Sequence, residues 1–204
     1  MPQIFHFTHG SNLGSILETG VLRAHRSAAA RTDIADASIK ERRSTITVTC
    51  GPGGTVCDYV PFYFAPCSPM LFSIKSDNVP GVDADQRGLI YLVTSTEVVL
   101  GAHLRCVFTD DNAAAAFSTF HDDAAAMGDI VDWPLMRERY WSNTLEDNDR
   151  VRRRGAEFLV HEAVPLACFE EIGVYDEAVR DRVEAIVQRA GSALPVRIRR
   201  GWYF

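Results

Sequence analysis

The sequence predicts an α+β fold, and three observations lead to that class. Short strand-like segments recur along the chain, helical patterns cluster early, and the elements lack the regular β-α-β alternation of a doubly wound sheet. The 204 residues include 47% hydrophobic and 10% aromatic side chains, which suffices for one buried core. We therefore expect a single domain over residues 1–204.

The chain begins with a strand and a helix. Residues 3–8 (Gln-Ile-Phe-His-Phe-Thr) predict the strand. Ser11 or Asn12 supplies the N-cap of a short amphipathic helix, and Gly20 supplies its C-cap. The small and polar residues of 27–35 predict a loop after these elements.

The middle of the chain alternates between helical and extended segments. Residues 36–43 predict a short helix, the β-branched residues of 45–49 a strand, and the glycines of 51–54 a turn. A further strand is expected at 60–64. The apolar run at 88–94 predicts the most clearly buried strand, with a short helix after it.

The last part of the chain adds strands and one long helix. Residues 112–120 are helical in composition, and Asp176 caps a helix with an apolar face that ends at Gly191. Residues 110–149 are otherwise acidic and irregular. Four segments with strand-like composition complete the expected sheet: 105–109, 156–160, 171–175 and 195–200.

The charge balance argues against a protein that binds nucleic acid through bulk electrostatics. The net charge is −6 at pH 7 and the isoelectric point is about 5.5. Of the 21 basic residues, however, only Lys40 and Lys75 are lysines and the others are arginines. Arginine forks suit phosphate, although a GC-rich genome would also favour arginine. Composition therefore leaves phosphate recognition open.

Several classes of protein are excluded by missing patterns. The five cysteines are odd in number and form no C-x-x-C pair, so we expect no disulfide framework, no four-cysteine zinc site and a cytoplasmic location. No apolar run has the length of a membrane span, and the first residues do not resemble a signal peptide. Dinucleotide-binding, P-loop, serine hydrolase and zinc protease motifs are also missing.

Three groups of residues have the chemistry of a functional site. His6 and Thr8 share one face of the first strand and form either a satisfied core pair or a hydrogen-bonding edge for a ribose. Arg43 belongs either to a solvated helix face or to a pyrophosphate site. Glu157 follows an arginine cluster, 150–154, whose charge could stabilise this carboxylate; the alternative is a solvated edge strand.

Aromatic residues precede the arginine cluster. Tyr140 and Trp141 offer ring faces on which unstacked bases can stack. Trp133 and Trp141 are equally compatible with a place in the core. Basic residues interleaved with aromatic ones are typical of proteins that bind single strands.

Taken in order, a series of segments resembles the DarT family, the DNA ADP-ribosyltransferase toxins of DarT–DarG toxin–antitoxin systems. The segments run nearly from end to end: 5–9 with 12–13, 39–43, 58–64, 68–71, 140–144, 153–160 and 202–204. The resemblance implies a compact ADP-ribosyltransferase fold, a central split β-sheet with flanking helices. It also implies NAD as co-substrate, no metal, and transfer to a base of single-stranded DNA, most commonly thymidine.

The resemblance also implies roles for individual residues. Glu157 and Arg43 match the catalytic pair, and 27–45 and 117–157 match the NAD-capping segment and the substrate-recognition loop. One position departs from the family pattern, because Cys67 stands where the family usually has arginine. The residues expected to bind NAD are His6, Phe7, Thr8, Asn12, Arg23 and Arg43, and those expected to bind DNA are Tyr140, Trp141, Arg150, Arg153 and Arg154.

The expected partners follow from the same resemblance. They are single-stranded DNA and an antitoxin with a DarG-like macrodomain that removes ADP-ribose, while the chain itself is expected to be a monomer away from membranes. Two other functions stay open: an ADP-ribosyltransferase acting on guanosine, RNA or protein, and a catalytically silent nucleotide-binding module. A silent module is the less favoured, because Glu157, Arg43 and His6 are all present.

Overall fold

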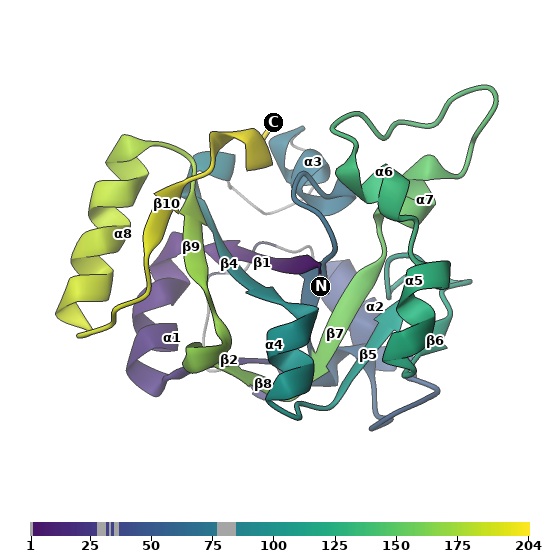
Figure 1. Cartoon of the computed structure of the whole chain (residues 1–204), viewed down its shortest axis with the longest axis horizontal. Helices are drawn as coiled ribbons and strands as arrows, with labels where there is room; N and C mark the ends of the chain where they lie inside the picture. The colour runs from purple at the N-terminus through teal and green to yellow at the C-terminus, as the bar shows by residue number, and fades with distance from the viewer. Residues whose placement is uncertain (1, 28–31, 33, 35–36, 77–84) are drawn as a thin grey trace.

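One large sheet organises the molecule. The computed structural model describes residues 2–27, 32, 34, 37–76 and 85–204, so parts of the expected loop and of the NAD-capping segment at 27–45 lie outside the described residues. The sheet has eight strands in the order β10-β9-β4-β1-β3-β7-β5-β6 (Figure 1). Their bounds are β1 Gln3–His9, β3 Tyr59–Tyr63, β4 Leu89–Ser95, β5 Cys106–Thr109, β6 Phe120–His121, β7 Glu157–His161, β9 Glu171–Val174 and β10 Val196–Ile198. A separate two-stranded sheet pairs β2 (Val21–Arg23) with β8 (Ala163–Pro165).

The sheet is split at its centre. β1 pairs with β4 along its whole length, from Gln3 to His9. Its pairing with β3, on the other side, is confined to Phe5 opposite Tyr63. Pro61, in the middle of β3, has no N–H to donate to a neighbouring strand. The two halves of the sheet therefore diverge beyond one point of contact, which confirms the expected split sheet.

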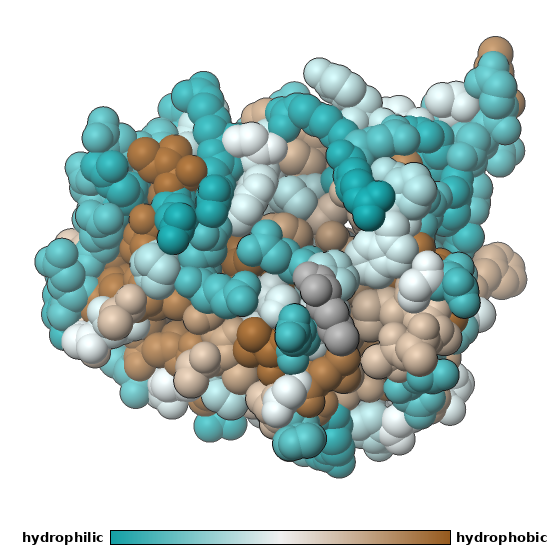
Figure 2. Space-filling model, in the orientation of Figure 1, coloured by the Kyte–Doolittle hydropathy of each residue, from teal (hydrophilic) through white to brown (hydrophobic). Residues whose placement is uncertain are grey.

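Helices flank both halves of the sheet. α8 lies at one end of the molecule beside β9 and β10, while α5, α6 and α7 lie at the opposite end near β5 and β6 (Figure 1). Hydrophilic side chains predominate over α8 and over the loop between α6 and α7, which also carries the fully exposed Leu145 (Figure 2). The helices are α1 Leu13–Thr19, α2 Ala37–Thr45, α3 Pro69–Lys75, α4 Thr96–Gly101, α5 Met127–Ile130, α6 Trp133–Arg137, α7 Arg150–Arg154 and α8 Glu177–Arg189.

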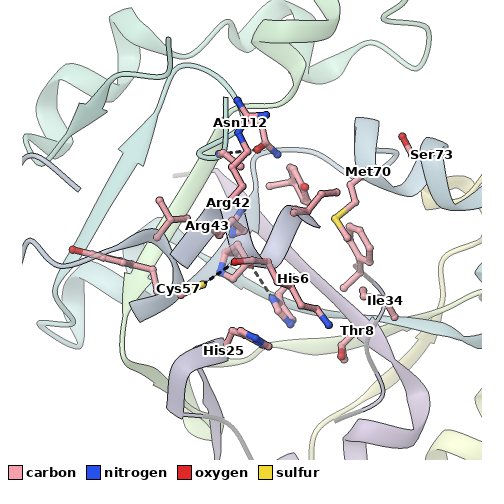
Figure 3. Close-up of a pocket in the computed structure, with 18 of the residues that line it drawn as sticks. His6, Thr8, His25, Ile34, Arg42, Arg43, Cys57, Met70, Ser73 and Asn112 are labelled. Atoms are coloured by element: carbon pink, nitrogen blue, oxygen red, sulfur yellow. Dashed lines mark hydrogen bonds between the residues drawn. The ribbon is translucent and has the colours of Figure 1, made fainter. Parts of the chain in front are cut away.

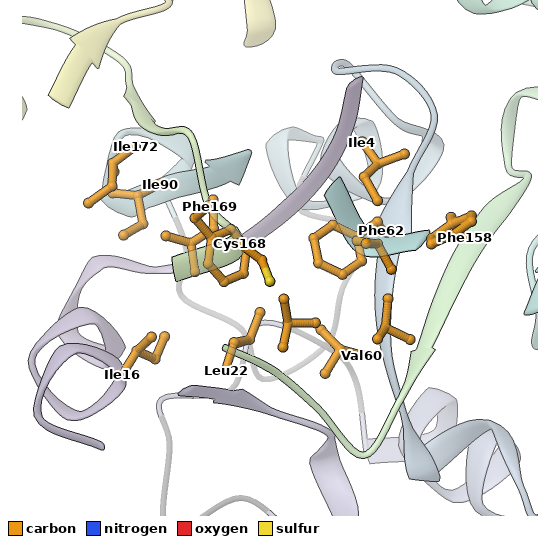
Figure 4. Close-up of a cluster of buried hydrophobic side chains, with 14 of the residues drawn as sticks. Ile4, Ile16, Leu22, Val60, Phe62, Ile90, Phe158, Cys168, Phe169 and Ile172 are labelled. Atoms are coloured by element: carbon orange, nitrogen blue, oxygen red, sulfur yellow. The ribbon is translucent and has the colours of Figure 1, made fainter. Parts of the chain in front are cut away.

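Strand alternation sends side chains to the two faces of the sheet, where they join separate core clusters. Ile4 joins the larger cluster, which includes Phe62, Phe158 and Ile172 (Figure 4). Its neighbour Phe5 points the other way, into a cluster with residues of α3. β4 is buried on both faces, as its continuous apolar run predicted. Burying both faces fixes the register of the central strands, because a slip of one residue would exchange the two sets of side chains.

Most predicted elements are confirmed, but the strand at 45–49 is wrong. α2 continues to Thr45, whose hydroxyl donates to the Arg42 carbonyl at 2.9 Å. The residues that follow make one isolated bridge, between Thr47 and Thr55, and join no sheet. The turn at 51–54 is confirmed, with left-handed φ angles at Gly51, Gly53 and Gly54. The β-branched residues thus form an extended segment that pairs only briefly, through Val48 N–H to the Gly54 carbonyl and Val56 N–H to the Ile46 carbonyl, and is too short to be a strand.

The predicted helix at 112–120 is also wrong. The Asn112 side chain accepts from the Ala114 N–H at 2.8 Å, and the Ala113 N–H donates to Glu157 at 3.3 Å. These side-chain bonds replace the i to i−4 backbone bonds that a helix would need. The segment instead forms turns that connect β5 to β6 and contact Glu157 on the way.

In the described part of the chain, no helix is long and apolar enough to cross a membrane.

Candidate active site

The centre of the candidate site is an ion pair between residues 114 positions apart. Two nitrogens of the Arg43 guanidinium donate to the two carboxylate oxygens of Glu157, at 3.1 and 3.0 Å. Glu157 has no exposed surface, and the Arg43 side chain is 15% exposed. The paired fork geometry is the strongest arrangement available to these two side chains. Arg43 therefore covers the carboxylate on the side that faces the cavity.

The backbone holds Glu157 in place. The Glu157 N–H donates to Thr109 Oγ1 at 3.1 Å, and Thr109 Oγ1 donates to the Asp111 carbonyl at 2.6 Å. The Ala113 N–H contacts the carboxylate from the turn after β5. Glu157 also lies opposite Tyr63 in the β3–β7 ladder. The carboxylate is thus fixed by two neighbouring strands and one turn.

Burial and charge set the protonation of Arg43 and Tyr63. Burial by itself lowers the pKa of Arg43, but the adjacent Glu157 charge and hydrogen bonds outweigh this effect and raise the pKa above its ordinary value. Burial, followed by the charge of Glu157, raises the pKa of Tyr63 well above its ordinary value. Around neutral pH, Arg43 is therefore cationic and the Tyr63 phenol is protonated.

A cavity of about 510 Å³ opens where β1 and β3 diverge. Figure 3 shows His6 and Thr8 from β1 and Arg43 from α2 along its wall. His6 Nδ1 hydrogen-bonds to the Pro61 carbonyl at 2.8 Å, which ties the ring to the strand across the split. The volume falls in the range of small-molecule sites.

The residues predicted to bind NAD come together in this cavity. His6, Phe7, Thr8, Asn12, Arg23 and Arg43 all contribute to its lining. Asn12 Nδ2 donates to Thr8 Oγ1 at 2.9 Å and to the Thr32 carbonyl at 2.9 Å. This amide therefore joins β1 to the described part of the 27–45 segment. The lining also includes Tyr63 and Asn112, which the sequence did not single out.

The residues predicted to bind DNA are not gathered on one exposed basic surface. Arg154 is 3% exposed, and its guanidinium donates to backbone carbonyls, among them those of Leu135 and Pro66 at 2.8 and 2.6 Å. Trp141 is 7% exposed and donates its indole N–H to the Cys67 carbonyl. In this structure both side chains hold the chain together rather than face solvent.

The other members of the arginine cluster are paired with acids. Arg150 contacts Glu138, and Arg153 contacts Asp132 and Asp147. Tyr140, by contrast, is 83% exposed and offers a free ring face. Arg43, and not the 150–154 cluster, is the cation that contacts Glu157.

Cys67 occupies a buried position in the left-handed region, with φ 54° and 3% exposure. Burial raises the pKa of its thiol, which makes it a poor nucleophile. Although position 67 is not the arginine usual in the family, an arginine lies beside it: Arg139 Nη1 is 4.0 Å from the Cys67 sulfur. The same guanidinium donates to the carbonyls of Gly201 and Tyr203 at 2.7 and 3.1 Å.

The described residues contain no group of three His, Cys, Asp or Glu side chains that could hold a metal ion. The chemistry that the site offers is instead that of a buried carboxylate, a cation and hydrogen-bonding groups around a cavity. Such a carboxylate can stabilise positive charge on a bound sugar.

Comparisons with known proteins identify relatives that match this chain along nearly its whole length. DNA ADP-ribosyl transferases of Thermus sp. (strain 2.9) and Thermus aquaticus are 38% and 36% identical over 204 residues, covering 98% of this chain and 95% and 88% of those proteins. The solved structure of Thermus sp. 2.9 DarT in complex with ADP-ribosylated ssDNA superposes with a TM-score of 0.92 at 36% identity, covering 100% of this chain and 96% of that one. The same enzyme in complex with NAD+ gives 0.89 at 33% identity, covering 100% and 98%. The family model described as "ssDNA thymidine ADP-ribosyltransferase, DarT" matches residues 5–204, and the chain therefore belongs to the DarT family of DNA ADP-ribosyltransferases.

Proposed function

We propose that this chain transfers ADP-ribose from NAD to thymidine in single-stranded DNA and releases nicotinamide. The observation that carries the proposal is the buried Glu157 carboxylate, held by Arg43 and the Ala113 N–H beside a cavity lined by His6 and Thr8. Family membership supports the substrate class. The cavity has the size and the polar groups that a dinucleotide requires, since hydroxyl, amide and imidazole groups line it together with four basic side chains, Arg23, Lys40, Arg42 and Arg43.

NAD supplies the ADP-ribosyl group: its bond to nicotinamide breaks with the electron pair on nicotinamide, and the thymine nitrogen that forms the new bond gives up its proton. Glu157 stabilises the positive charge that grows on the ribose. Because Glu157 is fully covered, Arg43 must move before a ribose can contact the carboxylate. The pyrophosphate offers the displaced guanidinium a new anionic partner.

We assign Arg43 a binding role and not that of a base. Its raised pKa beside Glu157 keeps it protonated at neutral pH. Glu157 is the better acceptor for the thymine proton, because a carboxylate can take a proton that an arginine cation cannot. His6 holds the wall of the cavity through the Pro61 carbonyl, and Asn12 orients the Thr8 hydroxyl.

The biological setting is proposed from the same family. The chain acts as a monomeric toxin in the cytoplasm, and an antitoxin with a macrodomain ADP-ribosylglycohydrolase reverses its modification of DNA. From the same family we propose that 27–45 caps NAD and that 117–157 recognises the substrate. Among the DNA-binding candidates, the exposed Tyr140 is the one best placed to stack on a base.

The test is a panel of substrates incubated with NAD. We expect the mass of one ADP-ribosyl group on thymine-containing single strands, and none on the matching duplex, because a duplex requires unpairing before the base edge is accessible. Glu184→Gln, on the distant helix α8, is the matched control for Glu157→Gln. Adducts on RNA, guanine or protein in place of thymine would replace this proposal with one of the alternatives.

A further inference from the structure

Two stretches of the cavity wall pack against the same short turn, Val56–Asp58. Arg23 and His25 line the cavity from the end of β2 and the residues after it, and Arg43 lines it from α2. The turn contacts both the stretch His25–Ser27 and α2. Its placement therefore decides where the basic side chains of the NAD site lie.

On the α2 side, the turn is joined to the helix through backbone carbonyls. Cys57, on the wall of the cavity in Figure 3, donates from Sγ to the Lys40 carbonyl at 3.6 Å. The Val56 N–H donates to the Ile46 carbonyl, just after the helix, at 3.1 Å. Because uncharged carbonyls accept these bonds, this side of the turn is held without a side-chain charge.

The other stretch is held to the turn by an ion pair. Arg26 Nη2 donates to Thr55 Oγ1 at 2.8 Å, and Arg26 Nε lies 2.5 Å from one carboxylate oxygen of Asp58. The second oxygen of Asp58 accepts from the N–H and the hydroxyl of Thr55, at 2.7 and 2.9 Å. Each of the three side chains thus contacts the other two, and we call them the Arg26 network.

Arg26 and Asp58 do not line the cavity themselves. They act on it through His25, which lies between two anchored neighbours. On one side, the Ala24 N–H donates to the Glu162 carbonyl at 2.7 Å. On the other side, Arg26 is held in the Arg26 network. Since both neighbours are fixed, the His25 ring is kept in the cavity wall (Figure 3).

The Arg26 network lies far from the reacting bond. Asp58 immediately precedes β3, and Glu157 pairs with Tyr63 at the far end of that strand. A strand of five residues spans about 16 Å. The Arg26 side chain is 55% exposed, so water and salt screen its charge over that distance. Loss of the network should therefore change how NAD is held and leave the transfer step intact.

We propose that Arg26 and Asp58 are positioning residues for NAD: their ion pair, completed by Thr55, fixes the Arg23–His25 stretch to the turn that also holds α2, so that the two sides of the cavity keep one spacing. The inference rests on the proposed function and adds which residues outside the cavity set the affinity for NAD. A dinucleotide brings anionic phosphates to these walls. Walls that are already in place lose less freedom when it binds.

The first test separates NAD binding from the transfer step. Arg26→Gln and Asp58→Asn each remove one charge and keep a polar side chain. Each should raise the KM for NAD by about 3- to 10-fold, the range for one partly exposed charged hydrogen bond, and leave kcat within about twofold. NAD affinity, measured by calorimetry without DNA, should fall by the same factor. Arg180→Gln, which breaks exposed ion pairs of α8, is the matched control and should change neither.

The second test shows whether the two residues act as one unit. The double variant Arg26→Gln, Asp58→Asn should raise the KM for NAD no more than the more affected single variant, because no pair is left to lose once one partner is gone. Arg26→Lys keeps the charge but replaces the fork with a single ammonium group, so it should recover part of the affinity.

Three results would overturn the positioning role and leave the proposed function standing: an unchanged KM in both single variants, a fall in kcat without a rise in KM, or effects that add in the double variant. A wild-type protein that binds NAD and modifies no DNA would overturn the proposed function, while calorimetry on the variants would still decide the positioning role. A wild-type protein that binds no NAD would overturn both.

Discussion

Replacing Glu157 by glutamine removes the charge of the site and keeps its shape. The carboxylate has no exposed surface and receives two hydrogen bonds from Arg43 and one from the Ala113 N–H. In such a site an effective dielectric constant of about 20 applies, and a unit charge about 4 Å away is stabilised by about 4 kcal/mol. At 1.36 kcal/mol per factor of ten, that energy corresponds to roughly a thousandfold in rate.

Part of this effect survives in Glu157→Gln, because the amide oxygen still accepts a hydrogen bond. We therefore expect DNA modification to fall by at least ~100-fold. Arg43 loses its counter-charge, but it borders the cavity and can turn toward solvent, so the free energy of unfolding should drop by only about 1–3 kcal/mol. Initial rates of adduct formation by mass spectrometry and thermal unfolding measure the two effects separately.

The control for this prediction is Glu184→Gln, which should retain the activity of the wild type. A Glu157→Gln variant that is folded, binds NAD and modifies DNA within a few-fold of the wild-type rate would refute the reasoning. In that case the buried carboxylate would serve the fold and not the transfer step. The ion pair between Arg43 and Glu157 would then have a structural role only.

Other predictions concern the supports of the site. Arg154→Leu should lower the free energy of unfolding by about 3–5 kcal/mol, because it leaves several buried carbonyls without a donor; an unchanged denaturation midpoint would contradict this role. Thr109→Val removes the acceptor of the Glu157 N–H and should reduce the rate by about tenfold with little change in the KM for NAD; a rise in KM alone would argue against positioning. Hydrogen bonds and Arg152 hold the pKa of Asp110 below its ordinary value despite burial, so its stabilisation is present above about pH 4 and is lost as the pH falls through the folded-state pKa. Asp110→Asn should therefore be less stable than the wild type at neutral pH, and the two unfolding curves should converge in acid. Prolonged treatment with a chelator should leave the rate unchanged, and a loss restored by one divalent metal would show a metal requirement.

Local signals predicted much of the fold. The apolar run at 88–94 became β4 because burial on both faces requires such a run. Asp176 caps α8 by accepting from the Val179 N–H, and Gly191 follows with φ 65°. These features depend on neighbours in the sequence, which is why they could be predicted.

The wrong elements depend on contacts from far along the chain. Alanine-rich 112–120 has the composition of a helix, but the Ala113 N–H is taken by Glu157, which lies 44 positions away. In the same way, the bond between Arg43 and Glu157 spans 114 positions, and no spacing rule reveals it. Resemblance to a family indicated both residues, while their direct pairing is a finding of the structure.

The acidic segment and the arginine cluster were both recognised in the sequence, but the sequence did not reveal that they pair with each other. The sequence has ten acidic residues in 110–149 and five positions, 150–154, dominated by arginine. The structure pairs many of these charges with one another, for example Arg153 with Asp132. The arginines of the cluster therefore bind the acidic segment to α7, while the cation that contacts Glu157 is Arg43 of α2.

The most direct test uses a single-stranded oligonucleotide that contains one thymine. Incubated with NAD and the wild-type protein, it should gain one ADP-ribosyl group, which fragmentation should place on that thymine. The same oligonucleotide with N3-methylthymine should gain none, because thymine has no other ring N–H to give up. Modification of the methylated strand, or of a strand without thymine, would contradict transfer to the thymine nitrogen beside Glu157.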